Sequence, residues 1–197
     1  IADELVDGAA AQAHTDPAAA LDAYEQTILA APQRRLHTDP IVHAYAITAR
    51  RCGFHREYLA AFFNSMRADL TQREYSPSEL QDYIYGSAEA IGLLCLQIFL
   101  AEEDVSPADR AAMERGARAL GSAFQKINFL RDLGEDSSTL GRTYFQQAPS
   151  GRIDEATKSA LIAEIRQELA TAALTIDVLP ASARVGVSAA ADIFAEL

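Results

Sequence analysis

Residues 128–144 read NFLRDLGEDSSTLGRTY and place two aspartates, Asp132 and Asp136, four positions apart. A second pair with the same spacing, Asp3 and Asp7, lies in the segment DELVD at the start of the sequence. Residues four positions apart share one face of an α-helix, with side chains about 6 Å apart, so the two carboxylates of each pair repel one another. Because a helix gains no stability from such a pair, its occurrence twice predicts a divalent cation between the carboxylates.

The segment that leads into the second pair carries one line of polar side chains. Gln125, Asn128, Asp132 and Asp136 follow one another at steps of three, four and four, and apolar residues occupy the other helical faces. Buried amides and carboxylates are costly without partners. Oxygen ligands in such a line suit Mg²⁺, with Mn²⁺ as an alternative, because Mg²⁺ binds a few carboxylates and keeps positions for water and phosphate oxygen.

The composition predicts an all-α protein. The chain has 197 residues, is 49% hydrophobic and contains only seven prolines. Alanine and leucine dominate, and long stretches lack glycine or clustered β-branched residues, which favours helix. We find no internal repeat, low-complexity tract or linker, so a single domain covering residues 1–197 is expected.

Capping residues and prolines divide the chain into helices. Four segments combine an acceptor side chain with a proline at the first helical position. They are Asp16-Pro17, Asp39-Pro40, Ser76-Pro77-Ser78-Glu79 and Ser106-Pro107-Ala108-Asp109. The predicted helices cover roughly 17–31, 40–52, 55–71, 77–101, 107–132 and 154–178, with a loop over about 137–151 and a short helix after residue 180.

Charge and cysteine content restrict the partners and the compartment. The net charge of −11 disfavours nucleic acid and anionic lipid, which carry the same sign as the protein. No apolar run reaches the about 18 residues that a membrane span needs, and no secretion signal is present, so we expect a cytoplasmic protein. Cys52 and Cys95 lie far apart without histidines at ligand spacing, which predicts reduced core thiols.

Residues 83–92, YIYGSAEAIG, place two glycines inside a segment that otherwise favours helix. Each glycine costs about 1 kcal/mol relative to alanine, so Gly86 and Gly92 predict close packing or a kink. Glu89 is either a partly buried acid with an arginine partner or a residue on the wetter side of the helix. For Phe62, Phe63, Phe124 and Phe129, aromatic spacing alone does not separate core packing from a cavity wall.

Taken together, these motifs resemble the squalene/phytoene synthase family. The ordered set QxxNxLRDxxEDxxxxGRxY begins at Gln125, YIYGSAEAIG precedes it by about forty residues, and DELVD stands at the front. A lone DxxxD carries little information, but this set is hard to obtain by chance. The resemblance covers essentially the whole chain. The family extends further at both ends, and the sequence begins without methionine, so we expect residues upstream and downstream.

The resemblance implies an isoprenoid synthase-type helical bundle around a central apolar cavity, here one trans-isoprenyl diphosphate synthase domain. Aspartates on two facing helices at its mouth hold Mg²⁺ against the diphosphate of an isoprenoid substrate. By match to the family motifs, the metal-binding residues are Asp3, Asp7, Asn128, Asp132 and Asp136. The resemblance also gives Tyr83, near the reacting carbons, and the four aspartates as catalytic residues. The substrate-binding positions are Gln125, Asn128, Arg131, Arg142 and Tyr144.

The implied activity is head-to-head prenyl transfer, in which two geranylgeranyl diphosphates form phytoene through a cyclopropylcarbinyl diphosphate. The stretch GSAEAIGLLCLQIF resembles bacterial phytoene synthases most. Alternatives are squalene or dehydrosqualene synthesis from farnesyl diphosphate, and a non-catalytic relative with the same fold. The absence of adjacent aspartates argues against cyclising and chain-elongating synthases, which carry DDxxD-type clusters. Peripheral membrane association for product release and the oligomeric state stay open at this point.

Overall fold

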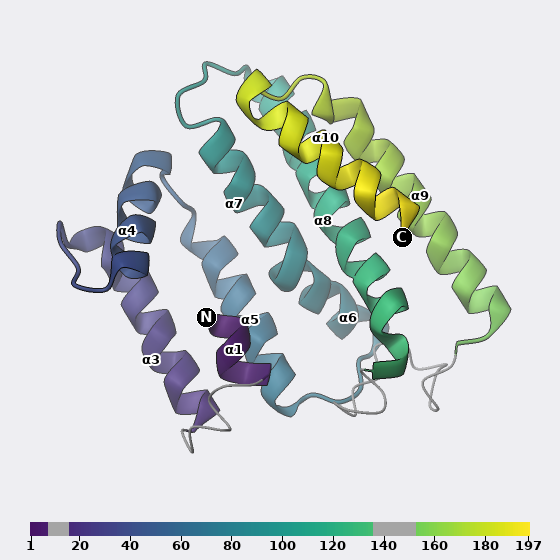
Figure 1. Ribbon diagram of the computed structural model, residues 1–197, viewed down its shortest axis with the longest axis horizontal. Helices are drawn as coiled ribbons and strands as arrows, with labels where there is room; N and C mark the ends of the chain where they lie inside the picture. Colours follow the sequence, from purple (N-terminus) through teal and green to yellow (C-terminus); the bar gives the residue numbers. More distant parts are fainter. Residues whose placement is uncertain (8–15, 136–152) are drawn as a thin grey trace.

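The structure, a computed structural model, describes residues 1–7, 16–135 and 153–197 (Figure 1). These residues form α1 (Ala2–Asp7), α3 (Pro17–Ala30), η1 (Ala31–Gln33), α4 (Pro40–Cys52), α5 (Arg56–Thr71), α6 (Pro77–Ile84), η2 (Tyr85–Glu89), α7 (Ala90–Phe99), α8 (Pro107–Glu135), α9 (Glu155–Ile176) and α10 (Ala181–Glu196). Within these ranges the chain forms no strand, so the all-α prediction is confirmed. None of the described helices is long and apolar enough to cross a bilayer.

All four predicted helix starts are confirmed, and side-chain caps explain their positions. The Asp16 carboxylate accepts hydrogen bonds from the backbone N–H groups of residues 18 and 19, and Asp39 does the same for residues 41 and 42. Ser76 and Glu79 form the predicted capping box, in which each side chain caps the other residue's N–H. These bonds satisfy donors that every helix start leaves free.

The segment predicted as one helix over 77–101 is instead divided by a π-helical turn, η2, between α6 and α7. Gly86 lies in this turn, and a Cβ placed on it would stand 2.2 Å from the backbone oxygen of Ala61 in α5. Only a residue without a side chain permits that approach, and π turns inside helices widen the backbone locally. Close packing, one of the two predicted reasons for the glycine, is therefore confirmed at Gly86.

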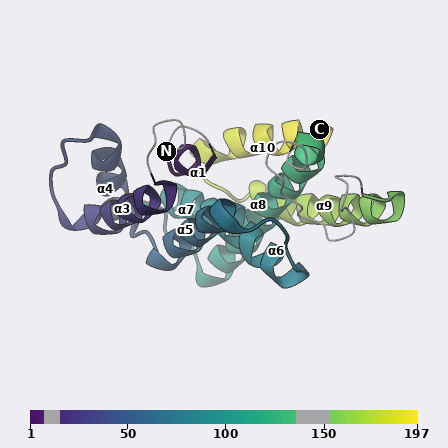
Figure 2. The same cartoon turned by 90° about the horizontal axis from the view of Figure 1, so that it is seen from below.

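Most of the helices form a layer, and helices α1 and α10 lie on one side of it. Figure 1 shows α3, α5, α7, α8 and α9 arranged across the molecule, with α4 at one end and α9 at the other. Helix α8 packs along α9, and α5 packs against η2. In Figure 2, α1, α10 and the C-terminal end of α8 lie on the same side of this layer. Helix α1, with the first aspartate pair, and the end of α8, with Asp132, thus lie on the same side.

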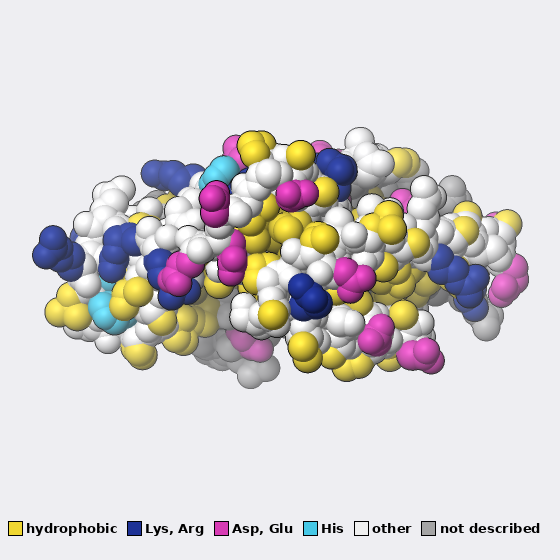
Figure 3. Space-filling view, turned by 90° about the horizontal axis from the view of Figure 1, so that it is seen from above, with side chains coloured by type: hydrophobic (Ala, Val, Ile, Leu, Met, Phe, Trp, Pro, Cys, Tyr) yellow, Lys and Arg dark blue, Asp and Glu magenta, His cyan; other side chains and the backbone are white. Residues whose placement is uncertain are grey.

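Buried apolar side chains occupy both halves of the layer. Leu21 of α3 and Phe63 of α5 are almost completely buried in the half near α1. In the other half, Ala123 and Ile127 of α8 pack with Leu161 of α9. Figure 3 shows that hydrophobic side chains also line a hollow near the middle of one face. The core therefore continues into a concave apolar surface.

Candidate active site

The first aspartate pair lies on α1, and Asp132 of the second pair lies near the C-terminal end of α8. Asp3 is exposed on α1, and Asp7 is the last residue of that helix. Asp132 is half-buried near the end of α8. Three predicted site residues lie outside the described residues: Asp136, Arg142 and Tyr144. The approach of the two pairs across the cavity therefore stays a prediction, with α1 and the end of α8 on the same side of the layer (Figure 2).

The predicted polar stripe on α8 is half-buried, and it contains an oxygen without a donor. Gln125, Asn128 and Asp132 are each partly accessible. The side-chain oxygen Oδ1 of Asn128 is buried and accepts no hydrogen bond from any described residue. A buried amide oxygen without a partner costs free energy, which a cation or a water would recover. Asn128 lies one turn before the Asp132 carboxylate, and this pair of oxygen donors fits a hard divalent cation.

A complete metal site needs more donors than these two. Among residues 1–7, 16–135 and 153–197, no group of three or more His, Cys, Asp or Glu side chains is placed to hold a metal ion. Asp136, the third member of the predicted set on this segment, falls outside those ranges.

Arg131 pairs with the neighbouring aspartate of the motif. Its Nε donates to Oδ1 of Asp132 and its NH2 group donates to Oδ2, each at 2.7 Å. This two-pronged contact holds the pKa of the Asp132 carboxyl below its ordinary value, because the guanidinium stabilises the charged form. The guanidinium therefore favours the charged form of the carboxyl and occupies both of its oxygens.

Tyr83 is buried beside the last turns of α8. It is 7% exposed, and its hydroxyl donates to Oδ1 of the buried Asp69 in α5 at 2.9 Å. The rings of Tyr75 and Phe129 stand 5.2 and 6.1 Å from the Tyr83 ring. Phe129 follows Asn128 directly, so this aromatic cluster supports the stretch of α8 that carries the stripe. Asp69 fixes the Tyr83 hydroxyl and was not singled out in the sequence.

An apolar cavity of about 570 Å³ lies among α7, α8, α9 and α10. Its lining includes Ile91, Phe99, Leu120, Phe124, Ala172 and Leu179. Ser87 and Gln125 contribute polar groups, and the buried hydroxyl of Ser87 has no hydrogen-bond partner among the described residues. Gln125 belongs both to the polar stripe and to the cavity wall. The stripe and the apolar cavity are therefore neighbours, as a site for a molecule with a charged head and a hydrocarbon tail requires.

The cavity shows which role Phe124 has, a question that the sequence left open, and it corrects the prediction for Cys95. Phe124 lines the cavity, where its ring stacks on Phe194 at 3.9 Å, whereas Phe63 is a core residue. The prediction of two core thiols is wrong for Cys95, which is exposed in the cavity wall on the same face of α7 as Ile91. Cys52 is half-buried, and both thiols are free.

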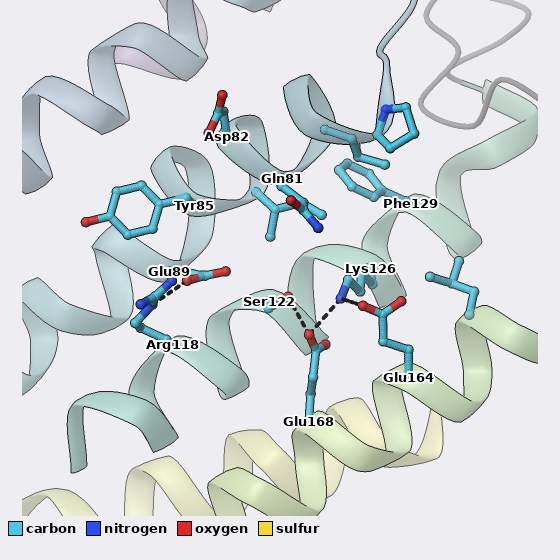
Figure 4. Close-up of a pocket in the computed structure, with 14 residues that line it drawn as sticks. Gln81, Asp82, Tyr85, Glu89, Arg118, Ser122, Lys126, Phe129, Glu164 and Glu168 are labelled. Carbon is cyan, nitrogen blue, oxygen red and sulfur yellow. Dashed lines mark hydrogen bonds and ion pairs between the residues drawn. The ribbon is translucent and has the colours of Figure 1, made fainter. Parts of the chain in front are cut away.

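A second cleft, of about 540 Å³, is polar and lies between α6, η2, α8 and α9 (Figure 4). Lys126 is buried there and donates to Glu164 and to Glu168 of α9, each at 2.6 Å. Ser122 also donates to Glu168. Burial alone would lower the pKa of Lys126, but the hydrogen bonds to both glutamates outweigh it, so the pKa is raised. These contacts join α8 to α9.

On the other side of the same cleft, Arg118 of α8 donates to Glu89 of η2 at 2.6 Å and lies over the Tyr85 ring. Of the two alternatives for Glu89, the partly buried acid with an arginine partner is therefore confirmed. Sequence reasoning did not find Lys126 or its partners. The available signal was the spacing of Glu164 and Glu168, which repeats four residues apart like Ser122 and Lys126.

Comparisons with known proteins identify a matching family, several relatives and solved structures with a similar fold. The family model described as squalene/phytoene synthase matches residues 1–197. Phytoene synthase 3 of Zea mays is 38% identical over 149 residues, which are 74% of this chain and 33% of that protein. The 4,4'-diapophytoene synthase of Staphylococcus haemolyticus is 33% identical over 111 residues, 56% of this chain and 36% of that protein. The chain thus spans about a third of the length of these relatives.

A crystal structure of a dehydrosqualene synthase in complex with ligand superimposes with a TM-score of 0.78, at 20% sequence identity. The superposition covers 98% of this chain and 69% of that one. At this identity the likeness concerns the fold, and it confirms the isoprenoid synthase-type helical arrangement.

Proposed function

The chain belongs to the squalene/phytoene synthase family, as the motif over residues 125–144 predicted, and from this membership we propose that its protein is a head-to-head prenyltransferase. The proposed reaction joins two geranylgeranyl diphosphates into phytoene through a cyclopropylcarbinyl diphosphate. We further propose that residues 1–197 are part of one trans-isoprenyl diphosphate synthase domain. The similarity to Zea mays phytoene synthase 3 over most of this chain supports the choice of substrate.

The observation that carries the proposal is the contact between the polar stripe and the apolar cavity. Gln125 lines the cavity, and Asn128 offers a buried oxygen without a donor among the described residues. Asp132 follows on the same face as an ionised carboxylate. A prenyl diphosphate has two matching parts: its diphosphate binds metal ions and cationic side chains, and its hydrocarbon chain packs against apolar walls.

We propose that Asn128 and Asp132, together with Asp3, Asp7 and Asp136, hold Mg²⁺. When bound, Mg²⁺ supplies the positive charge that neutralises the departing diphosphate. Arg131 and Arg142 are proposed to add hydrogen bonds to the phosphate oxygens. Arg131 donates to the Asp132 carboxylate in the structure, so hydrogen bonds to a diphosphate require its guanidinium to share that contact or leave it.

The cavity walls protect the cations that this chemistry generates. Breaking the allylic carbon–oxygen bond releases diphosphate and leaves an allylic cation, and the double bond of the second substrate attacks it to form the new carbon–carbon bond. Loss of a proton closes the cyclopropane ring, and this intermediate keeps the diphosphate of the second substrate. Departure of that diphosphate gives a second cation, which rearranges and loses another proton to form phytoene. Water would quench the cation, and apolar side chains such as Phe124 exclude it. Tyr83 is proposed to lie near the reacting carbons, with its hydroxyl held by Asp69.

The test is product formation by the full-length protein from labelled geranylgeranyl and farnesyl diphosphates, supplied separately. We expect phytoene from the first, and loss of at least about 100-fold in kcat for Asp132→Asn, because one charge-stabilising group is worth about that much. Asp192→Asn, at an exposed position on α10, is the matched control and retains activity. Preference for farnesyl diphosphate would support the alternative, squalene or dehydrosqualene synthesis. If the protein consumes neither diphosphate, the remaining alternative is a non-catalytic relative with the same fold.

A further inference from the structure

Residues 31–56 differ in charge from the rest of the chain. This segment contains five of the chain's 17 lysine and arginine residues but one of its 28 aspartate and glutamate residues, Asp39. It comprises η1, the connection to α4, α4 itself and the start of α5. In a protein with a net charge of −11, such a segment is a local exception.

The same segment exposes large apolar side chains. Leu36 is 75% exposed in the connection, and Ile41 and Ile47 of α4 are 55% and 48% exposed. The opposite face of α4, with Val42 and Ala46, is buried in the core. Helix α4 is therefore apolar on both faces, although only one of them has a partner within the described structure.

Hydrogen bonds hold the connection against α4, so the exposed side chains of the two segments lie at the same end of the molecule. The NH1 group of Arg50 donates to the backbone oxygen of Arg34 at 2.6 Å. His37 contacts the oxygen of Ala31 through Nε2 at 2.9 Å, and its backbone N–H donates to His43 of α4. Figure 3 shows dark blue and yellow side chains gathered together at the left end of the molecule, where Figure 1 places α4.

We define the basic face by its exposed residues Arg34, Arg35, Leu36, Ile41, Ile47 and Arg51. We propose that the basic face docks on the surface of an anionic lipid bilayer. The arginines would lie among the lipid phosphates, and the leucine and isoleucines would enter the boundary between headgroups and acyl chains. This docking does not depend on the reaction proposed above, and it would be a local exception to the expectation from net charge that anionic lipid is disfavoured.

Two features favour lipid over an acidic protein surface. An acidic partner would account for the arginines, but it gives no reason for a leucine that is 75% exposed between them. The remaining acidic surface would be repelled from an anionic bilayer, so a single orientation is favoured. Each arginine near such a surface strengthens binding by about fivefold, and salt screens the effect.

The experiment measures co-sedimentation of the protein with vesicles of phosphatidylcholine, with or without phosphatidylserine. We expect binding to the anionic vesicles, weakened by salt. The variant Arg34→Gln/Arg35→Gln/Arg51→Gln should bind about 100-fold less tightly. Its matched control removes three exposed cations elsewhere, Arg115, Lys158 and Arg166, and should lose much less affinity than the arginine variant. Circular dichroism checks that each variant is folded.

A second pair of variants measures how much the exposed apolar side chains contribute to vesicle binding. Leu36→Ser should weaken binding to anionic vesicles by about tenfold, whereas Leu174→Ser, at an 80% exposed position on α9, should leave it unchanged. Absence of binding to anionic vesicles, or equal losses in the control variants, would overturn the proposal. So would self-association in the ultracentrifuge that the arginine variant abolishes without any vesicle binding by the parent, since the face would then serve a second copy of the chain.

Discussion

Replacing Lys126 with methionine tests how α8 and α9 are held together. The lysine side chain is 9% exposed and contacts Glu164 and Glu168, whose side chains are 58% and 20% exposed. Removing one partner of a buried ion pair costs about 3–5 kcal/mol. The exposed Glu164 side chain is solvated at little cost without the lysine. The loss in free energy of unfolding therefore comes mainly from Glu168, and we expect the lower end of that range, about 3 kcal/mol. For a chain of this size, that lowers the thermal midpoint by about 6–12 °C.

The assay is urea unfolding followed by circular dichroism, with Lys158→Met as the exposed control, expected within about 0.5 kcal/mol of the parent. The double variant Lys126→Met/Glu168→Gln removes the unpaired charge and should recover about 2 kcal/mol. A loss below about 1 kcal/mol for Lys126→Met, or strictly additive effects in the double variant, would refute the reasoning.

The pH dependence of the same pair has a definite sign. The pKa of Lys126 is raised above its ordinary value of 10.5. Its contribution to stability is therefore complete below pH 10.5 and is lost as the pH rises through the higher folded pKa. The parent should lose its advantage over Lys126→Met in that alkaline range, and a constant difference across it would contradict the assignment.

The remaining predictions concern the site and the glycines. Arg131→Gln should raise the Asp132 pKa toward its ordinary value of 3.8, which carbon-detected NMR titration of that carboxyl measures; an unchanged value would mean that the ion pair is absent in solution. Gly86→Ala should destabilise the protein by about 3 kcal/mol, because its Cβ meets the Ala61 backbone at 2.2 Å. Gly186→Ala, with no atom within 4 Å of its Cβ, should instead stabilise α10 by up to about 1 kcal/mol; equal effects at both glycines in thermal unfolding would disprove this contrast. Gly186→Leu reaches into the apolar cavity and should shift product from the longer toward the shorter prenyl chain, as chromatography of the products would show.

The features predicted correctly from the sequence are those that depend on neighbouring residues. Asp39 caps α4 because its carboxylate reaches backbone groups two and three residues away. The polar stripe on α8 follows from the helical period alone, and the order of motifs predicted the family. Such patterns are local, because each depends on residues that are at most a few positions apart in the chain.

The features that were missed depend on distant partners. The π-helical turn at η2 accompanies the approach of Gly86 to α5, and the partner of Glu89 lies 29 residues later in the chain. Asp69 is a charged residue on a helix face with Phe62 and Met66, and its hydrogen bond from Tyr83 depends on the position of that residue in space. The exposure of Cys95 could not be predicted, because the cavity that exposes it is formed together with three other helices.

The central claim is that two acidic pairs, distant in the sequence, meet at one apolar cavity and hold Mg²⁺ against a diphosphate. The most direct measurement is a crystal structure of the full-length protein with Mg²⁺ and an unreactive thiodiphosphate analogue of the prenyl substrate. The account predicts metal ions bound by Asn128, Asp132 and Asp136 on one side of the diphosphate and by Asp3 and Asp7 on the other, with the prenyl chain beside Phe124. Aspartate pairs that face bulk solvent in that complex, without metal between them, would contradict it.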